Sequence, residues 1–223
     1  MSNIQLADMM SDRYNKIKIT LATGEEIIGK SLGIEPAFDN DGEELEYEQL
    51  VLEPDEKYAY IRLRNEDIKT FKKLMQEAFQ YGYESTCGKD DSLVLPEEDI
   101  DNSLNNPKCK SYEMIDEKGN ILGGAVVEIN EDNINHLDFL FVTVGIQSKG
   151  IGLAIWREIE NLYPNTKVWE TCTPYFDKRN IHFYVNKLKF RIVAYYNKKY
   201  PDPNRPEDVY DADDGMFEFK KEM

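Results

Sequence analysis

Gln147-Ser148-Lys149-Gly150-Ile151-Gly152-Leu153-Ala154 is the stretch that decides the fold of this chain. It follows the run Leu137 to Val144, whose β-branched and aromatic residues predict a strand. After it, apolar residues recur at helical spacing, namely Ile151, Ile155, Ile159 and Leu162. The pattern therefore predicts a glycine-rich turn between a strand and a helix that begins near Gly150.

A helix start of this kind suits a phosphate group. Its first N–H groups lack helical partners and carry partial positive charge, and glycines let an anion approach without meeting a Cβ atom. Lys149 adds a full positive charge. The spacing matches neither a Walker loop nor the dinucleotide pattern of three spaced glycines. A plain strand-to-helix turn without a ligand is the alternative interpretation.

A second motif lies further along, in Asn180-Ile181-His182-Phe183-Tyr184-Val185-Asn186-Lys187-Leu188-Lys189-Phe190. Together the two stretches resemble the GNAT N-acetyltransferases. The acyl-CoA loop of that family reads Gln/Arg-x-x-Gly-x-Gly/Ala, and its late helix carries Asn-x-x-Phe-Tyr-x-x-x-Gly-Phe. Asn180, Phe183, Tyr184 and Phe190 match the second pattern. Lys189 stands where the family has glycine, so strain is expected in the turn after this helix.

The resemblance covers residues 57 to 223 and implies an α+β GNAT acyl-CoA transferase fold, a mixed, mostly antiparallel sheet flanked by helices. It also implies acetyl-CoA as the co-substrate, held by a splayed strand whose backbone amides pair with the pantetheine arm and polarise the thioester. Val142 is the candidate for the oxyanion-facing amide, and Tyr184 is expected to protonate the departing thiolate. The expected cofactor-binding residues are Phe141, Val142, Val144, Gln147, Ser148, Lys149, Gly150, Ile151, Gly152, Leu153 and Asn180.

The general base has two main candidates, His136 and Asp138. They alternate with Leu137 and Phe139, so both are expected on one face of the central strand. Structural roles are open for each, because Asp138 could pair with a neighbouring strand and His136 could face solvent near the strand start. Glu170, on the next predicted strand, is a third option.

The acceptor side is predicted from the helix that follows residue 64. Asn65 is expected to cap it, with acidic residues in the first turn. Its apolar stripe is Ile68, Phe71, Leu74, Met75, Ala78 and Phe79. The helix is expected to end near Tyr81-Gly82-Tyr83 and, in the family layout, to border the acceptor cleft. The candidate substrate-binding residues are Tyr81, Tyr83, Glu84 and Glu170, with simple packing contacts as the alternative for the tyrosines.

Charge excludes one class of partner. The 43 acidic and 27 basic side chains leave a net charge of −16, and such a field repels nucleic acid. It attracts cationic acceptors such as polyamines, aminoglycosides, lysine side chains or basic peptide termini, although acidity for solubility alone is the alternative. No apolar run reaches membrane-spanning length and no signal core opens the sequence, so we expect no membrane contact and a cytoplasmic protein.

The cysteines favour reduced thiols. Cys87, Cys109 and Cys172 are odd in number and widely spaced, which argues against a disulfide framework and against a zinc site. No metal is therefore expected. Cys172 falls on a predicted strand, where a buried and inert side chain is favoured over a nucleophile.

Three regions are predicted: an N-terminal tail (1–12), a small β-barrel-like, SH3/Sm-like domain (13–56) and the transferase domain (57–223). Strict alternation from Lys16 to Leu21, a turn at Thr23-Gly24-Glu25 and apolar runs up to Ile34 and Leu52 predict the strands of the small domain. We expect it to dock on the transferase domain or on a second subunit of a possible homodimer. Its acidic loop, 39–44, is interpreted as solvated rather than as a calcium site. The remaining chain predicts the order βααβββαβαββ.

The expected function is transfer of an acetyl group from acetyl-CoA to a primary amine of a small cationic molecule or peptide, by direct attack in a ternary complex. The alternative is a catalytically silent acyl-CoA-binding or scaffold protein that retains the fold. Asn180 and Tyr184 favour the enzyme. Lys189, the absence of a proline after Val142 and the open choice of base favour the alternative.

Overall fold

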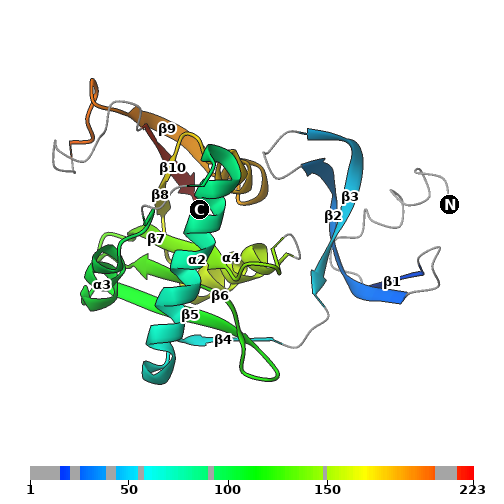
Figure 1. Cartoon of the computed structure of the whole chain (residues 1–223). Coiled ribbons are helices and arrows are strands. Elements are labelled where there is room, and N and C mark those ends of the chain that lie inside the picture. The colour runs from blue at the N-terminus through cyan, green and yellow to red at the C-terminus, as the bar shows by residue number, and fades with distance from the viewer. Residues whose placement is uncertain are drawn as a thin grey trace.

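The computed structural model describes residues 16–20, 26–38, 44–54, 58–89, 93–147, 150–203 and 215–223, with side chains from residue 58 onward. Figure 1 shows a central sheet with helices on both faces. Its strands are β4 (Tyr58–Arg62), β5 (Cys109–Asp116), β6 (Ile121–Glu128), β7 (Ile134–Val142), β8 (Val168–Pro174), β9 (Arg191–Tyr196) and β10 (Met216–Glu222). Their order across the sheet is β4-β5-β6-β7-β8-β10-β9.

The helices are η1 (Asn65–Asp67), α2 (Ile68–Cys87), α3 (Glu97–Asn105), α4 (Ile151–Leu162) and α5 (Lys178–His182), which continues into the π-helix η2 (Phe183–Lys187). With the strands they give the predicted order βααβββαβαββ. Neighbouring strands of the sheet are antiparallel except β7 and β8, which are parallel. A mixed, mostly antiparallel sheet is therefore confirmed.

Each face of the sheet has its own apolar core. On one face, α2 buries Phe71 and Met75 against Val126 and Phe141, and α3 adds Ile100. On the other face, α4 packs a second set of side chains against the sheet. The members of this second set that α4 contributes are Ile151, Ala154, Ile155, Trp156 and Ile159. Both helical stripes are confirmed except at one end of each: Ile68 is not among the residues of either core, and Leu162 at the end of α4 is 48% exposed.

A β-bulge in β7 changes which side chains face each core. Val126 pairs with Phe139 and Val127 with Leu137, so Asp138 is the extra residue on β7. Before the bulge Leu137 joins the α4 core, whereas after it Phe139 and Phe141 join the α2 core. His136 alternates with Leu137 and therefore lies on the α2 face. Asp138 lies there too, because it bonds to Ser103 of α3 and Cys109 of β5.

Several predicted boundaries differ from the structure. Asn65 does not cap α2: it lies in the 3-10 turn η1, and α2 begins at Ile68 without a side-chain cap. The helix also continues past Gly82 to Cys87. At the other end of the site, β7 ends at Val142, so Val144 lies in the following turn rather than on the strand.

The N-terminal strands form a separate antiparallel sheet. β1 (Lys16–Thr20), β2 (Glu26–Phe38) and β3 (Glu44–Pro54) pair in the order β1-β2-β3. The predicted hairpin and third strand are present, but closure into a barrel is not shown. The 1–12 tail and residues 39–43 of the acidic loop lie outside the described residues. A domain at 13–56 stays a prediction. Among the described helices, none combines the length and apolarity that a membrane span requires.

Candidate active site

The site is built around a split between β7 and β8. These strands pair only at their first residues, Ile134 with Val168, Asn135 with Trp169 and His136 with Glu170, and then both continue without further pairing. Where they part, the buried Thr171 hydroxyl donates to the carbonyl oxygen of Leu137 at 2.9 Å. The side chain thereby satisfies a carbonyl that β8 no longer reaches, which stabilises the split.

Backbone amides of β7 point toward this split. The amide of Thr143 donates to Leu122 at 2.9 Å, on the β6 side. Since N–H directions alternate along a strand, the amides of Val142 and Leu140 point the other way, toward the side from which β8 has diverged. Phe141 has the opposite orientation, with its amide toward β6 and its ring packed on Phe71. The amide of Val142, the expected oxyanion donor, thus points away from β6, and the amide of Leu140 points the same way; the oxyanion role of Val142 stays a prediction.

The glycine loop leads from the split into α4. Gly150 has a φ of 78°, a left-handed conformation that favours glycine, and the first bond of α4 runs from Ala154 to its carbonyl. The amides of Ile151, Gly152 and Leu153 therefore lie at the open end of the helix, where an anion is stabilised. At Gly152 a Cβ atom would lie 3.2 Å from the ring of Phe183, so close packing leaves little room for a side chain here.

Other loop residues have varied positions. Gln147 uses its side-chain oxygen to accept from the amide of Gly145 at 2.7 Å, which ties the turn after β7 to itself. Ser148 and Lys149 lie outside the described residues. Asn180 lies in the first turn of α5, where its backbone amide donates to Asp177 Oδ1 at 2.8 Å.

Tyr184 lies on the α4 side of the split. Only 6% of its surface is exposed, and its ring packs against Phe190 and Phe219. Burial raises the pKa of the Tyr184 phenol well above its usual value, and a hydrogen bond with Thr171 offsets this only in part. The phenol therefore keeps its proton at neutral pH. Its neighbour Thr171 is the residue at which the strands part, so a proton donor lies at the base of the split.

The helix that carries Tyr184 contains one residue more than the family pattern. The pattern has three residues between tyrosine and glycine, whereas four separate Tyr184 from Lys189. The structure absorbs the extra residue as the π-helix η2, in which Leu188 donates to the carbonyl of Phe183, five residues back. Lys189 then adopts a φ of 66°, which confirms the expected strain at this position.

His136 and Asp138 form an ion pair on the opposite face of the sheet. His136 Nδ1 lies 2.8 Å from Asp138 Oδ1, and the two side chains are 33% and 16% exposed. Burial lowers the pKa of His136, but Asp138 and the Cys172 thiol group bond to it and outweigh burial, raising it to about 9. For Asp138, burial raises the pKa, yet bonds from His136, Ser103 and Cys109 hold it below its usual value. At neutral pH the pair is an imidazolium beside a carboxylate.

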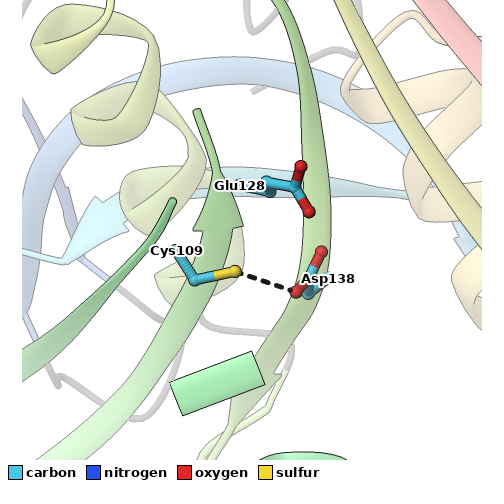
Figure 2. Close-up of side chains that lie close together, drawn as sticks. All are labelled: Cys109, Glu128 and Asp138. Atoms are coloured by element: carbon cyan, nitrogen blue, oxygen red, sulfur yellow. Dashed lines mark hydrogen bonds between the residues drawn. The ribbon is translucent and has the colours of Figure 1, made fainter. Parts of the chain in front are cut away.

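Asp138 also belongs to a group of three close side chains. Figure 2 shows Cys109 and Asp138 joined by a hydrogen bond, with Glu128 beside them. The Cys109 sulfur donates to Asp138 Oδ2 at 3.4 Å, and the ligand-type atoms of all three lie within 4.8 Å of one another. Burial and the nearby carboxylates raise the pKa of the Cys109 thiol to about 12, so the thiol keeps its proton. The expectation of no metal stays a prediction.

The candidate acceptor residues lie on the α2 face or at the end of α2. Glu170 forms an ion pair with Lys220 at 2.7 Å. Tyr83 packs its ring edge-on against Phe176 at 5.4 Å, which brings the end of α2 to the loop after β8. Tyr81 is 39% exposed, and Glu84 accepts a hydrogen bond from Gln80 at 2.9 Å. Of the four, Glu170 lies nearest to His136 in the strand register.

The predicted site residues thus fall on two sides of one sheet. Tyr184 and the loop before α4 share one face, and His136, Asp138 and Glu170 share the other. The split between β7 and β8 is where the two faces meet. Sequence patterns missed Thr171 and Cys172, because nothing along the chain indicated that Thr171 ends the strand pairing or that Cys172 contacts His136.

Comparisons with known proteins agree with this geometry. Residues 70–190 match the model of the acetyltransferase (GNAT) family. The chain belongs to the GNAT acetyltransferase family. A Bacillus subtilis (strain 168) relative, described as uncharacterized protein YrkN, is 42% identical over 168 residues, which are 72% of this chain and 90% of the relative.

Solved structures share the fold of this GNAT chain at low sequence identity. The ribosomal-protein-S18-alanine N-acetyltransferase from Escherichia coli superposes with a TM-score of 0.56 at 11% identity, covering 74% of this chain and 94% of its own. The PaiA N-acetyltransferase from Thermoplasma acidophilum, in complex with coenzyme A, superposes with a TM-score of 0.54 at 16% identity, covering 75% of this chain and 99% of its own. A GNAT family acetyltransferase from Elizabethkingia anophelis with acetyl-CoA bound superposes with a TM-score of 0.53 at 18% identity, covering 74% of this chain and 98% of its own.

Proposed function

We propose that this protein transfers an acetyl group from acetyl-CoA to a primary amine of a small cationic molecule or peptide, by direct attack in a ternary complex. The observation that carries the proposal is the split between β7 and β8, with the amides of Leu140 and Val142 directed toward it and the protonated Tyr184 at its base. Amide donors fixed in this way stabilise a developing oxyanion without reorganising.

Binding of acetyl-CoA is supported by the start of α4. The amides of Ile151, Gly152 and Leu153 would face the pyrophosphate. Gly150 adopts the left-handed conformation that favours glycine, and Phe183 lies close to the position of a Cβ at Gly152. Two structural neighbours contain coenzyme A or acetyl-CoA. Tyr184 would then give its proton to the thiolate that leaves, which needs a phenol that is protonated at neutral pH.

The base proposed here is His136, with Asp138 orienting it. Asp138 is a weak proton acceptor, because its bonded environment keeps its pKa low. His136 accepts a proton only in its neutral form, so the rate of acetyl transfer should rise with pH toward about 9. A cationic acceptor is supported by the net charge of −16. The carboxylates nearest His136 are themselves ion-paired, Asp138 with His136 and Glu170 with Lys220.

A catalytically silent acyl-CoA-binding protein is the second candidate. The extra residue in η2 and the left-handed Lys189 favour it, because both lie directly after the proposed acid. Thiol release separates the two. Purified protein and acetyl-CoA would be incubated with polyamines, aminoglycosides, amino acids and basic peptides, beside a control without acceptor. Acceptor-dependent thiol release is expected. Silence across the panel, with acetyl-CoA binding demonstrated, would contradict the proposed enzyme.

A further inference from the structure

Cys172 lies beside the imidazole of His136. His136 and Glu170 are paired across β7 and β8, and Cys172 follows Glu170 by two residues, on the same face of β8. Its side chain is partly exposed, whereas the sequence suggested a buried one; that it is inert stays a prediction. Asp138 bonds to Nδ1 of His136 at 2.8 Å, and Cys172 is a second hydrogen-bond partner of the same imidazole.

The imidazole is therefore held by groups on two strands, Asp138 on β7 and Cys172 on β8. We propose that Cys172 is a positioning residue, which fixes the orientation and the protonation of His136 for acetyl transfer. The proposal rests on the proposed function. Its chemistry is a carboxylate–imidazole–thiol chain, Asp138 to His136 to Cys172, that lies where the two strands part. A base that must meet an amine at one defined position needs a fixed ring plane more than a base in open solvent does.

Other charged groups surround this chain. Glu128 on β6 lies opposite His136, and Cys109 on β5 lies opposite Glu128. On the other side, Glu170 is the cross-strand partner of His136 and is bound to Lys220 of β10, which also contacts Glu218. These groups remain when Cys172 is replaced, so the effect of the thiol can be measured against a constant background.

The direct test is a titration of His136 in the full chain. The protein has two histidines, His136 and His182, so their imidazole NMR signals can be assigned with a His182→Gln variant. In Cys172→Ala the titration midpoint of His136 should fall by about half a unit or more, because one partner of the charged ring is lost. Cys172→Ser should restore part of the shift. Cys87→Ala, an exposed thiol at the end of α2, should leave the midpoint unchanged.

The second readout is the pH profile of kcat/KM with the best acceptor. Its ascending limb should move to lower pH in Cys172→Ala, together with the NMR midpoint, and kcat should fall because the ring is less well oriented. An unchanged NMR midpoint would overturn the proposal whatever the activity. A shifted midpoint with an unshifted kinetic limb would overturn the catalytic role of the hydrogen-bonded group Asp138, His136 and Cys172.

Two further outcomes keep the proposal separate from the proposed function. Mass spectrometry after brief incubation with acetyl-CoA should find Cys172 unmodified. An acetyl group on Cys172 would overturn the positioning role, because the thiol would then be a nucleophile. A shifted NMR midpoint in a protein that acetylates no amine would support the coupling of Cys172 to His136 while contradicting the acetyltransferase assignment.

Discussion

At Tyr184 a single hydroxyl carries the proposed acid role, and its removal can be tested without disturbing the core. Tyr184→Phe keeps the ring between Phe190 and Phe219 and removes only the oxygen. Turnover should fall by about tenfold or more, since a positioned acid contributes at least this much, whereas acetyl-CoA binding should change little. Steady-state rates and calorimetric binding check both. Equal turnover of variant and wild type would exclude Tyr184 as the acid.

Tyr163→Phe is the matched control for that substitution. Its hydroxyl bonds to Tyr112 at 2.6 Å, beyond the last turn of α4 and away from the split. The variant loses a partly buried hydroxyl of the same chemistry. Its turnover should match that of the wild type, so a fall in both variants would indicate a general loss of folded protein instead of a lost acid.

The ion pair of His136 and Asp138 predicts a stability window in pH. The pKa of His136 is raised from 6.5 to about 9. Its contribution to the free energy of unfolding is therefore full below pH 6.5 and is lost as the pH rises through 9. The pKa of Asp138 is lowered from 3.8, so its contribution is present above 3.8 and is lost as the pH falls further. The stability difference between wild type and Asp138→Asn should therefore be largest between pH 3.8 and 6.5.

Urea unfolding at several pH values measures this difference. Asp99→Asn, at an exposed carboxylate in the first turn of α3, is the control. The difference in free energy of unfolding between this variant and wild type should not decline between pH 6.5 and 9. A difference for Asp138→Asn that stays constant from pH 6.5 to 10 would contradict the ion pair.

Single residues were predictable where a local pattern carries the chemistry. The glycine-rich turn predicted a helix start near Gly150, Tyr184 belongs to a spaced motif, and alternation placed His136 with Asp138. The roles of Thr171 and Cys172 depend on which residues of β7 and β8 are paired, and periodicity along one strand does not fix the register between two. The bulge at Asp138 is equally invisible, because one extra residue looks like ordinary alternation until its partner strand is known.

At the scale of elements, the end of the π-helix η2 offers a stability test. Lys189 holds a φ of 66°, a conformation that costs a residue with a Cβ about 1–2 kcal/mol. Lys189→Gly relieves this strain, loses the Lys189 bond to the carbonyl of Asn186 and adds unfolded-state entropy. The net expectation is a free energy of unfolding higher by up to about 1 kcal/mol, measured by urea denaturation.

Asn133 provides the comparison for this substitution. It is the other described non-glycine residue with positive φ, at 63°, but asparagine tolerates the left-handed region better than lysine. The free energy of unfolding should therefore increase less in Asn133→Gly than in Lys189→Gly. A Lys189→Gly variant less stable than wild type would show that the strain at this turn is small.

Helix boundaries were the least predictable elements. Gly82 suggested the end of α2, yet the helix runs on to Cys87. A glycine inside a helix costs about 1 kcal/mol, and here Tyr83 packs on Phe176 and the nearest atom to a Cβ at Gly82 would be Asp177 at 4.0 Å. Tertiary packing outweighs the propensity, and only the fold reveals that the β8–α5 loop is there to pack against.

At the scale of the whole molecule, a net charge of −16 predicts salt-sensitive kinetics. The field of an acidic protein raises the encounter rate of cations, and about 1 M salt shortens its range to about 3 Å. For a polyamine acceptor, kcat/KM should fall several-fold between 20 mM and 500 mM salt, roughly as screening grows. A monoamine of equal chain length should lose less. Equal losses of kcat/KM for the two amines would contradict electrostatic attraction of the cationic acceptor.

The arrangement on two faces also bears on how the products depart. Tyr184 and the start of α4 lie on one face of the sheet, and His136 with its neighbours lies on the other. In the proposed reaction coenzyme A would leave past α4, and the acetylated amine would leave past α2. If each product leaves from its own face, release needs no obligatory order, and each product should inhibit in competition with its own substrate alone.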